Sequence, residues 1–171
     1  MADKKKKPDP APEKIKKAPR KLDELDKKTL KLIEGTASFV RGKIDAKGLP
    51  ELRFPTRALS NVKYDKAVGY FELGRGRKAR ALSVNTVKSF AQTLRLMAIS
   101  KEMVENDDFA TKREAYYVSK NWGECKFNDQ PESDTVLDDI EALASLDGLS
   151  REQLRFFPEE HGGSIAGGSP T

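Results

Sequence analysis

The residue types best suited to chemistry are two adjacent tyrosines, Tyr116 and Tyr117, that follow an arginine, Arg113. On a helix, Arg113 and Tyr117 stand four residues apart and share a face. A free phenol has a pKa of about 10, so a phenolate that attacks at neutral pH needs a nearby cation, base or metal. A guanidinium also matches two oxygens of a phosphate. The spacing indicates attack on a phosphodiester; the open alternative is a tyrosine pair that packs with one hydroxyl tethered.

The helix that carries the tyrosines has a clear start signal. Thr111 and Glu114 have the Thr-x-x-Glu form of a capping box, which predicts a helix from there to about Asn121. Lys112 and Tyr116 share the neighbouring face of that helix. The sequence therefore predicts a short helix that presents two differently placed tyrosines.

Two further helices are predicted on either side of this segment. One follows Ser83, a suitable cap, and runs to about residue 104, where residues 106–108 break the pattern. The other covers residues 136–144 and ends at Gly148. The apolar positions at helical spacing are Val84, Val87, Phe90, Ala91, Leu94, Met97 and Ala98 in the first, and Val136, Leu137, Ile140, Leu143 and Ala144 in the second.

Residues 50–82 have the alternation of β structure and a basic turn. Strands are predicted around 52–54, 62–64, 70–73 and 78–82. The last two flank the segment Gly74-Arg75-Gly76, which suits a hairpin connection because glycine tolerates positive φ. A phosphate-cradling loop is the weaker interpretation, since the rest of that fingerprint is missing. The hairpin would present Arg75, Arg77 and Lys78 at its tip.

The N-terminal part divides into a tail and a helix. Residues 1–21 are rich in Lys, Pro and Ala, and we expect them to be disordered. Residues 22–41 carry an amphipathic pattern that predicts a helix, whose apolar stripe needs a partner in the chain's own core or in another subunit. We expect four regions: a basic tail (1–21), a helix and linker (22–48), a main domain (49–157) and a linker segment (158–171).

Composition limits the class of protein. The 171 residues, 37% of them hydrophobic, supply one modest core, and no stretch approaches the roughly 20 apolar residues of a membrane span. No secretory signal is recognisable, and a single cysteine, Cys125, excludes a disulfide framework, so we expect a cytoplasmic location.

Charge is unevenly distributed along the chain. Residues 41–101 hold fourteen Lys/Arg against four Asp/Glu, whereas residues 102–171 hold six against sixteen. A basic half of this density is typical of a protein that binds a polyanion, most often nucleic acid, although a solvated surface is the alternative. Helices, a basic hairpin and small size together predict a mainly helical α+β fold of the winged-helix type.

Several segments in series resemble a known family. They are residues 53–57 (Arg-Phe-Pro-Thr-Arg), 69–74 (Gly-Tyr-Phe-Glu-Leu-Gly), 111–122, 133–140 and 163–167 (Gly-Ser-Ile-Ala-Gly). The series resembles the A subunit of archaeal DNA topoisomerase VI, a type IIB enzyme. Its Arg-acidic-x-aromatic-Tyr core is shared with the meiotic proteins that make recombination-initiating double-strand breaks. Single pieces are weak signals, but the ordered series is specific.

The resemblance implies a fold and a set of roles. The fold would be a winged-helix domain of the catabolite-activator type. Tyr117 would be the nucleophile that forms a 5′-phosphotyrosyl link and frees a 3′ hydroxyl, and Arg113 would be the cation that favours the phenolate and stabilises charge on the phosphoryl oxygens. With Lys112, the basic residues Arg75, Arg77 and Lys78 would contact DNA.

The resemblance also implies partners and cofactors. Two A subunits would cut both strands in an A2B2 assembly, with ATP bound by the B subunit, to relax or decatenate DNA near the nucleoid. B would contact the helix at 22–41. Mg²⁺ would bind a Toprim domain, which we do not find before residue 171. We interpret the Asp107-Asp108 and Asp138-Asp139 pairs as helix-end and solvated acids and assign no metal ligand. The alternatives are a winged-helix module that binds DNA without cutting it, and a scaffold that recruits a B-like partner.

Overall fold

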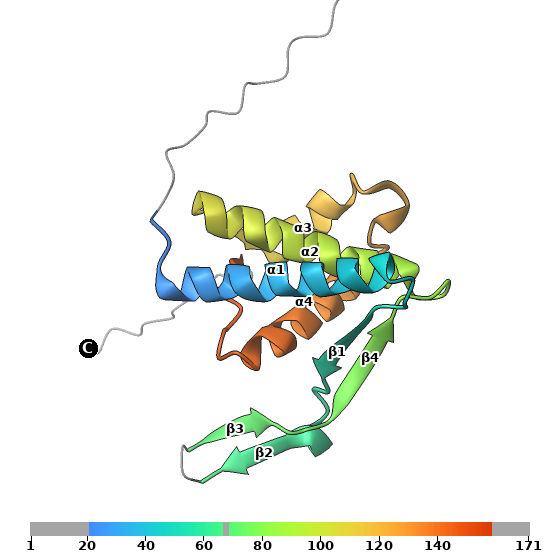
Figure 1. Ribbon diagram of the computed structural model, residues 1–171. Helices are drawn as coiled ribbons and strands as arrows, with labels where there is room; N and C mark the ends of the chain where they lie inside the picture. The colour runs from blue at the N-terminus through green and yellow to red at the C-terminus, as the bar shows by residue number, and fades with distance from the viewer. Residues whose placement is uncertain (1–20, 67–68, 159–171) are drawn as a thin grey trace, which may run out of the picture.

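The computed structural model describes residues 21–66 and 69–158. The elements run in the order α1 (Glu24–Asp45), β1 (Glu51–Pro55), η1 (Leu59–Asn61), β2 (Val62–Asp65), β3 (Tyr70–Leu73), β4 (Arg77–Ala81), α2 (Val87–Asn106), β5 (Ala110–Thr111), α3 (Lys112–Ser119), η2 (Gly123–Cys125), α4 (Gln130–Ser145) and β6 (Phe156–Phe157) (Figure 1). Helices and short strand pairs make an α+β fold, which confirms that part of the predicted class; the winged-helix type stays a prediction. The tail predicted to be disordered (1–21), except for Lys21, and the family-like segment at 163–167 lie outside the described residues.

Side-chain caps set where the main helices begin. Asp23 and Asp26 form a capping box at the start of α1. The predicted box of Thr111 and Glu114 is present at the start of α3, where each side chain accepts a hydrogen bond from the other residue's backbone N–H. The Asp129 side chain caps the start of α4, where it accepts a hydrogen bond from the Glu132 N–H. These local signals fix the helix that carries Tyr116 and Tyr117.

The helix α2 begins later than its sequence predicts. Residues 83–86 form a turn in which the Ser83 N–H and Oγ lie 3.0 and 2.8 Å from the Thr86 Oγ1. The helix therefore starts at Val87, with Thr86 as its first flanking residue. Val84 and Val87, predicted as core positions, are exposed, Val84 by 93%. The hydroxyl contacts of the turn outweigh helix propensity here.

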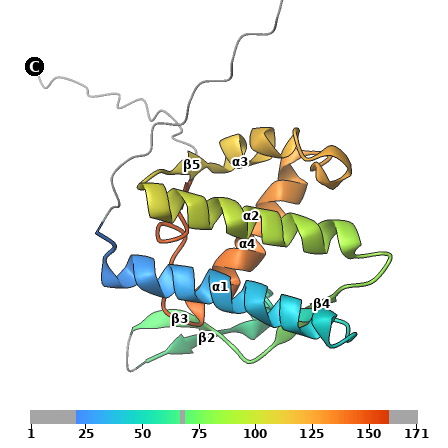
Figure 2. The same cartoon turned by 45° about the horizontal axis from the view of Figure 1, so that its top comes forward.

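The helices enclose the hydrophobic core. Figure 2 shows α1 and α2 running side by side, with α4 crossing them. A large cluster gathers Ile33, Leu96, Met97, Met103, Ala115, Phe127, Val136, Leu137, Ile140, Ala144, Leu149, Leu154 and Phe156. A smaller cluster joins Val40, Leu52, Phe54 and Phe90. Because α1 contributes to both clusters, the chain's own core covers much of its apolar stripe. The helix also carries exposed apolar side chains, Phe39 and Ile44.

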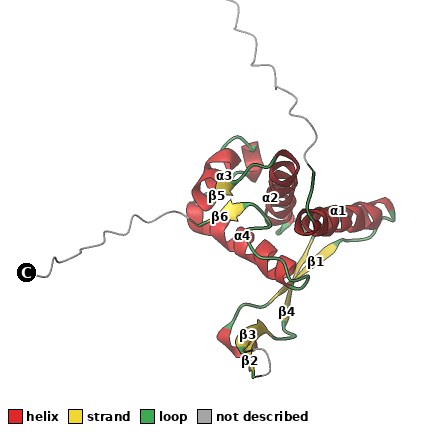
Figure 3. Cartoon of the chain, turned by 90° about the vertical axis from the view of Figure 1, so that its left-hand side faces the viewer, coloured by secondary structure: helices red, strands yellow, loops and turns green. Residues whose placement is uncertain are grey.

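The strands form an extended ribbon, which we call the β-arm (strands β1 to β4). β1 pairs antiparallel with β4, from Glu51 opposite Ala81 to Pro55 opposite Arg77. β2 pairs antiparallel with β3. Figures 1 and 3 show the β2–β3 end projecting away from the helices, while β1 packs on α4 at the base. The predicted strands are present, but the predicted hairpin between β3 and β4 is wrong, because those strands belong to different sheets.

A single asparagine explains the bend between the two halves of the β-arm. The Asn61 Oδ1 accepts a 2.8 Å hydrogen bond from the Gly76 N–H, and its Nδ2 donates to the carbonyl of Thr56 at 2.6 Å. A Cβ at Gly74 or Gly76 would lie 2.6 or 2.7 Å from the Asn61 Oδ1. The two glycines are therefore needed for close approach across the bend and not for a hairpin turn.

The strand β5, which directly precedes α3 in the chain, pairs in parallel with β6 near the end of the described residues. This pair is not predictable from the sequence, because two residues are too few to show alternation. Phe109 and Phe157 pack edge to face beside it, with ring centroids 5.6 Å apart. Among the described residues, no helix is both long and apolar enough to cross a membrane.

Candidate active site

The tyrosine helix α3 is short and is held on one side by α4. Its fully buried residues are Ala115 and Ser119, and Ala115 belongs to the large core. The Ser119 Oγ accepts a 3.4 Å hydrogen bond from the Phe127 N–H. The opposite side of α3 faces outward, and the Tyr117 side chain there is 53% exposed. A phenol in this position is open to a large substrate.

Arg113 contacts Tyr117 as the helical spacing predicts. The Arg113 Nε donates a 3.2 Å hydrogen bond to the Tyr117 Oη. The guanidinium carbon lies 5.7 Å from the centre of the Tyr117 ring. A charged donor on the phenol oxygen stabilises negative charge there, and the planar fork of a guanidinium matches two oxygens of a phosphate. The pair thus brings a cationic donor onto the oxygen of an exposed phenol.

The two tyrosines have different environments. Tyr116 is half-buried and packs against the large core, whereas Tyr117 is exposed. The Lys120 Nζ lies 4.1 Å from the centre of the Tyr116 ring and donates a 3.1 Å hydrogen bond to the carbonyl of Phe127. The packing alternative therefore describes Tyr116, whereas Tyr117 keeps its phenol in solvent.

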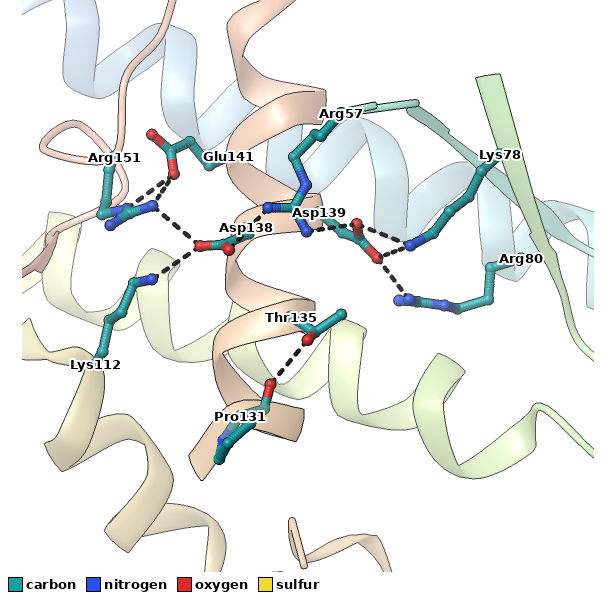
Figure 4. Close-up of polar contacts among 10 residues, drawn as sticks. All are labelled: Arg57, Lys78, Arg80, Lys112, Pro131, Thr135, Asp138, Asp139, Glu141 and Arg151. Carbon is teal, nitrogen blue, oxygen red and sulfur yellow. Dashed lines mark hydrogen bonds and ion pairs between the residues drawn. The ribbon is translucent and has the colours of Figure 1, made fainter. Parts of the chain in front are cut away.

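Beside α3, two aspartates of α4, Asp138 and Asp139, form ion pairs with several basic side chains (Figure 4). Asp139 is 2% exposed, and its carboxylate accepts hydrogen bonds from Lys78 at 3.0 Å and from Arg80 at 2.7 Å. Asp138 accepts from Lys112 at 2.9 Å. We call this group the aspartate network; its members are Asp138, Asp139, Glu141, Arg57, Lys78, Arg80, Lys112 and Arg151.

The ionisation of Asp138 reflects its position in the network. Partial burial alone would raise the pKa of this carboxyl group, but hydrogen bonds from Lys112 and Arg57, and the charges of both, lower it below its ordinary value. Asp138 is therefore held in the charged form that its cationic partners require.

The interpretation of Asp138 and Asp139 as solvated acids is wrong. Both carboxylates face basic side chains brought in from the β-arm and α3. Arg57, Arg80 and Arg151 are further partners that the sequence did not predict. One signal was available: Asp139 lies three residues after Val136 and four before Leu143, so it falls on the apolar side of its helix.

The residues predicted to bind DNA are separated by the fold. Lys112 and Lys78 belong to the aspartate network, where they contact Asp138 and Asp139 respectively. Arg75 and Arg77 lie at the bend of the β-arm and are exposed. The Arg77 Nη1 donates to the carbonyls of Gly74 and Gly76, at 2.8 and 3.1 Å. Arg113 is thus the basic residue that the structure places directly on the candidate nucleophile.

The described residues do not fit a magnesium site. No group of three or more His, Cys, Asp or Glu side chains in residues 21–66 and 69–158 is arranged to hold a metal ion. The adjacent carboxylates of Asp138 and Asp139 are paired with cationic side chains. We therefore assign no magnesium ligand among the described residues.

Comparison with known proteins places this site in a class. Residues 88–155, which include α3, most of α2 and all of α4, match the family model described as type IIB DNA topoisomerase. That class of enzyme belongs to the type II topoisomerases, which are isomerases.

The chain is also similar to particular proteins of this class. The chain is 50% identical over 118 residues to the A subunit of type 2 DNA topoisomerase 6 from Methanocaldococcus jannaschii, covering 69% of this chain and 31% of that protein. It is 30% identical over 149 residues to the corresponding protein of Archaeoglobus fulgidus, covering 85% of this chain and 40% of the relative. The family match and these relatives together support the interpretation that the chain is a fragment of a DNA topoisomerase VI A subunit. The chain spans about a third of the length of these relatives.

Proposed function

We propose that this chain provides the tyrosine domain of the DNA-cleaving subunit of a type IIB topoisomerase. The observation that carries the proposal is the exposed Tyr117 phenol with the Arg113 Nε 3.2 Å from its oxygen. The match over residues 88–155 and the names of the relatives point to the same activity.

The proposed reaction is a transesterification on the DNA backbone. The Tyr117 oxygen forms a bond to phosphorus, and the bond from phosphorus to the 3′ oxygen breaks. The phenol gives up its proton to solvent, and the departing 3′ oxygen takes one up. Arg113 stabilises the phenolate before attack and the phosphoryl oxygens during it. The phosphotyrosyl link conserves the bond energy, so the reverse attack reseals the strand.

The proposed partners follow from the names of the relatives. We propose duplex DNA, a second copy of this chain's own kind, and a B subunit that binds ATP, in an A2B2 assembly that relaxes or decatenates DNA in the cytoplasm. Mg²⁺ would be held by a Toprim domain outside the described residues. In this scheme the main domain at 49–157 is the winged-helix domain that binds DNA. The exposed apolar side chains of α1, among them Phe39 and Ile44, contact the B subunit.

The DNA surface in this proposal combines Arg113 with the outward basic residues of the β-arm. Arg75 and Arg77 are exposed at the bend, and Lys78 keeps nearly half of its side chain in solvent although it is paired with Asp139. Lys112 stands beside Arg113 at the start of α3, and its ammonium contacts Asp138. Binding by such residues depends on phosphate charge and should weaken with salt.

The test is covalent trapping. The chain is incubated with supercoiled plasmid, a topoisomerase VI B subunit, Mg²⁺ and ATP, and then quenched with detergent. We expect a protein–DNA adduct that Tyr117→Phe abolishes and that the matched control Tyr116→Phe retains. An adduct that survives Tyr117→Phe contradicts the assignment, and DNA retention without any adduct supports a binding module that does not cut.

A further inference from the structure

We infer that Asp138 is a positioning residue that couples the β-arm to the tyrosine helix. This inference rests on the proposed function, because it concerns how Tyr117 is placed on DNA that the arm also contacts. Asp138 lies in the middle of α4. It acts through Lys112 and Arg57, the two side chains that its carboxylate holds at once (Figure 4).

The two carboxylate oxygens of Asp138 join three parts of the chain. The Oδ1 accepts hydrogen bonds from the Lys112 Nζ at 2.9 Å and from the Arg151 Nη2 at 3.1 Å. The Oδ2 accepts one from the Arg57 Nη1 at 2.8 Å. Lys112 is the first residue of α3, and Arg57 lies in the link between β1 and η1. One side chain of α4 thus fixes the start of the tyrosine helix relative to the base of the arm.

The tyrosine helix is short, so its position depends on tertiary contacts of this kind. α3 has eight residues, a length at which a helix in water is not stable without tertiary contacts. Its fully buried residues are Ala115 and Ser119, in the middle and at the end of the helix. Lys112 holds the beginning, and its side chain is only 17% exposed, so its pairing with Asp138 is screened less than a surface ion pair.

The β-arm has a matching anchor on the same helix. The neighbouring Asp139 accepts from Lys78 and Arg80 on β4, and the second guanidinium nitrogen of Arg57 lies 3.6 Å from its Oδ1. Arg57 therefore spans both aspartates. A shift of the arm would pull on Arg57, and through Asp138 on Lys112 and the start of α3.

The charge balance separates this positioning role from DNA binding. The network holds five basic side chains and three acidic ones, so its formal charge is positive. Replacing Asp138 with Asn removes a negative charge and leaves every basic side chain in place. DNA should therefore bind at least as tightly, while the placement of Tyr117 loosens. If the network contacted DNA directly, Asp138→Asn would instead change the affinity for DNA.

The first arm of the experiment measures cleavage. In the trapping assay of the full chain, Asp138→Asn should lower adduct yield about tenfold, because small misplacements of a reacting group are costly. DNA affinity should be unchanged or higher. Asp138→Glu, which restores the charge, should recover most of the yield. The matched control is Asp147→Asn, the same change at an exposed acid after α4. An Asp138→Asn variant with full adduct yield overturns the inference.

The second arm does not depend on cleavage. Spin labels are placed at Lys63→Cys on the β-arm and Val118→Cys on α3, in a Cys125→Ser background, and the distance distribution is measured. Asp138→Asn and Arg57→Gln should each broaden it, and Asp147→Asn should not. Unchanged distributions overturn the coupling. If the parent chain gives no adduct, the proposed function fails, and this measurement alone decides the coupling.

Discussion

Basic side chains in the β-arm and near α3 fall into two groups with different surroundings. Arg57, Lys78, Arg80 and Lys112 end on the two aspartates of α4. Arg75, Arg77 and Arg113 face outward, where Arg77 bonds to backbone carbonyls and Arg113 to the Tyr117 phenol. The first group holds elements together, and the second contains the residues that we propose to contact DNA.

The difference shows how burial decides what a charge does. Arg80 is 11% exposed and also donates a 2.6 Å hydrogen bond to Thr93. A cation removed from water in this way needs its carboxylate, because an unpaired buried charge is costly. An exposed arginine carries no such requirement and can exchange water for phosphate at little cost. Net charge per segment does not separate these two cases.

The largest expected effect is on stability, in the buried half of the comparison. Asp139→Asn leaves Lys78 and Arg80 without their carboxylate, and we expect the free energy of unfolding to fall by about 3 kcal/mol. Urea denaturation followed by circular dichroism measures this. The control Asp147→Asn, at an exposed acid, should change stability by less than about 0.5 kcal/mol. Equal effects of the two variants would show that the network does not stabilise the fold.

A smaller effect is expected on DNA binding, in the outward half. Replacing Arg75 and Arg77 with Ala should weaken binding to a short duplex about tenfold at moderate salt and reduce the slope of log affinity against log salt by about 2. Lys78→Ala should have less effect on binding, because that ammonium is already paired with Asp139. Fluorescence anisotropy at several salt concentrations measures both. Unchanged binding in the double variant would remove the bend from the DNA surface.

Local signals in the sequence predicted the contacts within α3 better than they predicted how the strands pair. The Thr111 and Glu114 capping box fixes the start of α3, and four-residue spacing brings Arg113 to Tyr117. Both depend on residues within one helical turn, so the sequence shows them directly. The same is true of the strands, whose positions follow from alternation.

Long-range partners could not be predicted in this way. The partner of β3 is β2 and not β4, because the Asn61 side chain fills the bend beside Gly74 and Gly76. Similarly, Asp138 meets Arg57 across 81 positions of sequence. Such contacts depend on how elements pack, and neither spacing nor charge count carries that information.

The smallest expected effect is the pH dependence that Asp138 confers. In the unfolded chain an aspartate titrates at about pH 3.9. In the folded chain the hydrogen bonds from Lys112 and Arg57 outweigh partial burial and lower the pKa of Asp138. Below about pH 4 the unfolded state therefore binds more protons at this group. The stabilisation from Asp138 is complete above that pH and is lost as the pH falls through the folded pKa.

This sign gives a measurement that separates an ion pair from simple packing at Asp138. The difference in free energy of unfolding between the parent chain and Asp138→Asn should be largest near pH 6 and should shrink below about pH 4. Arg57→Gln removes one of the hydrogen-bond donors that lower the pKa, so it should narrow the pH range over which this loss occurs. A difference that stays constant from pH 6 to pH 3 would mean that shape, and not charge, holds Lys112 and the start of α3 in place.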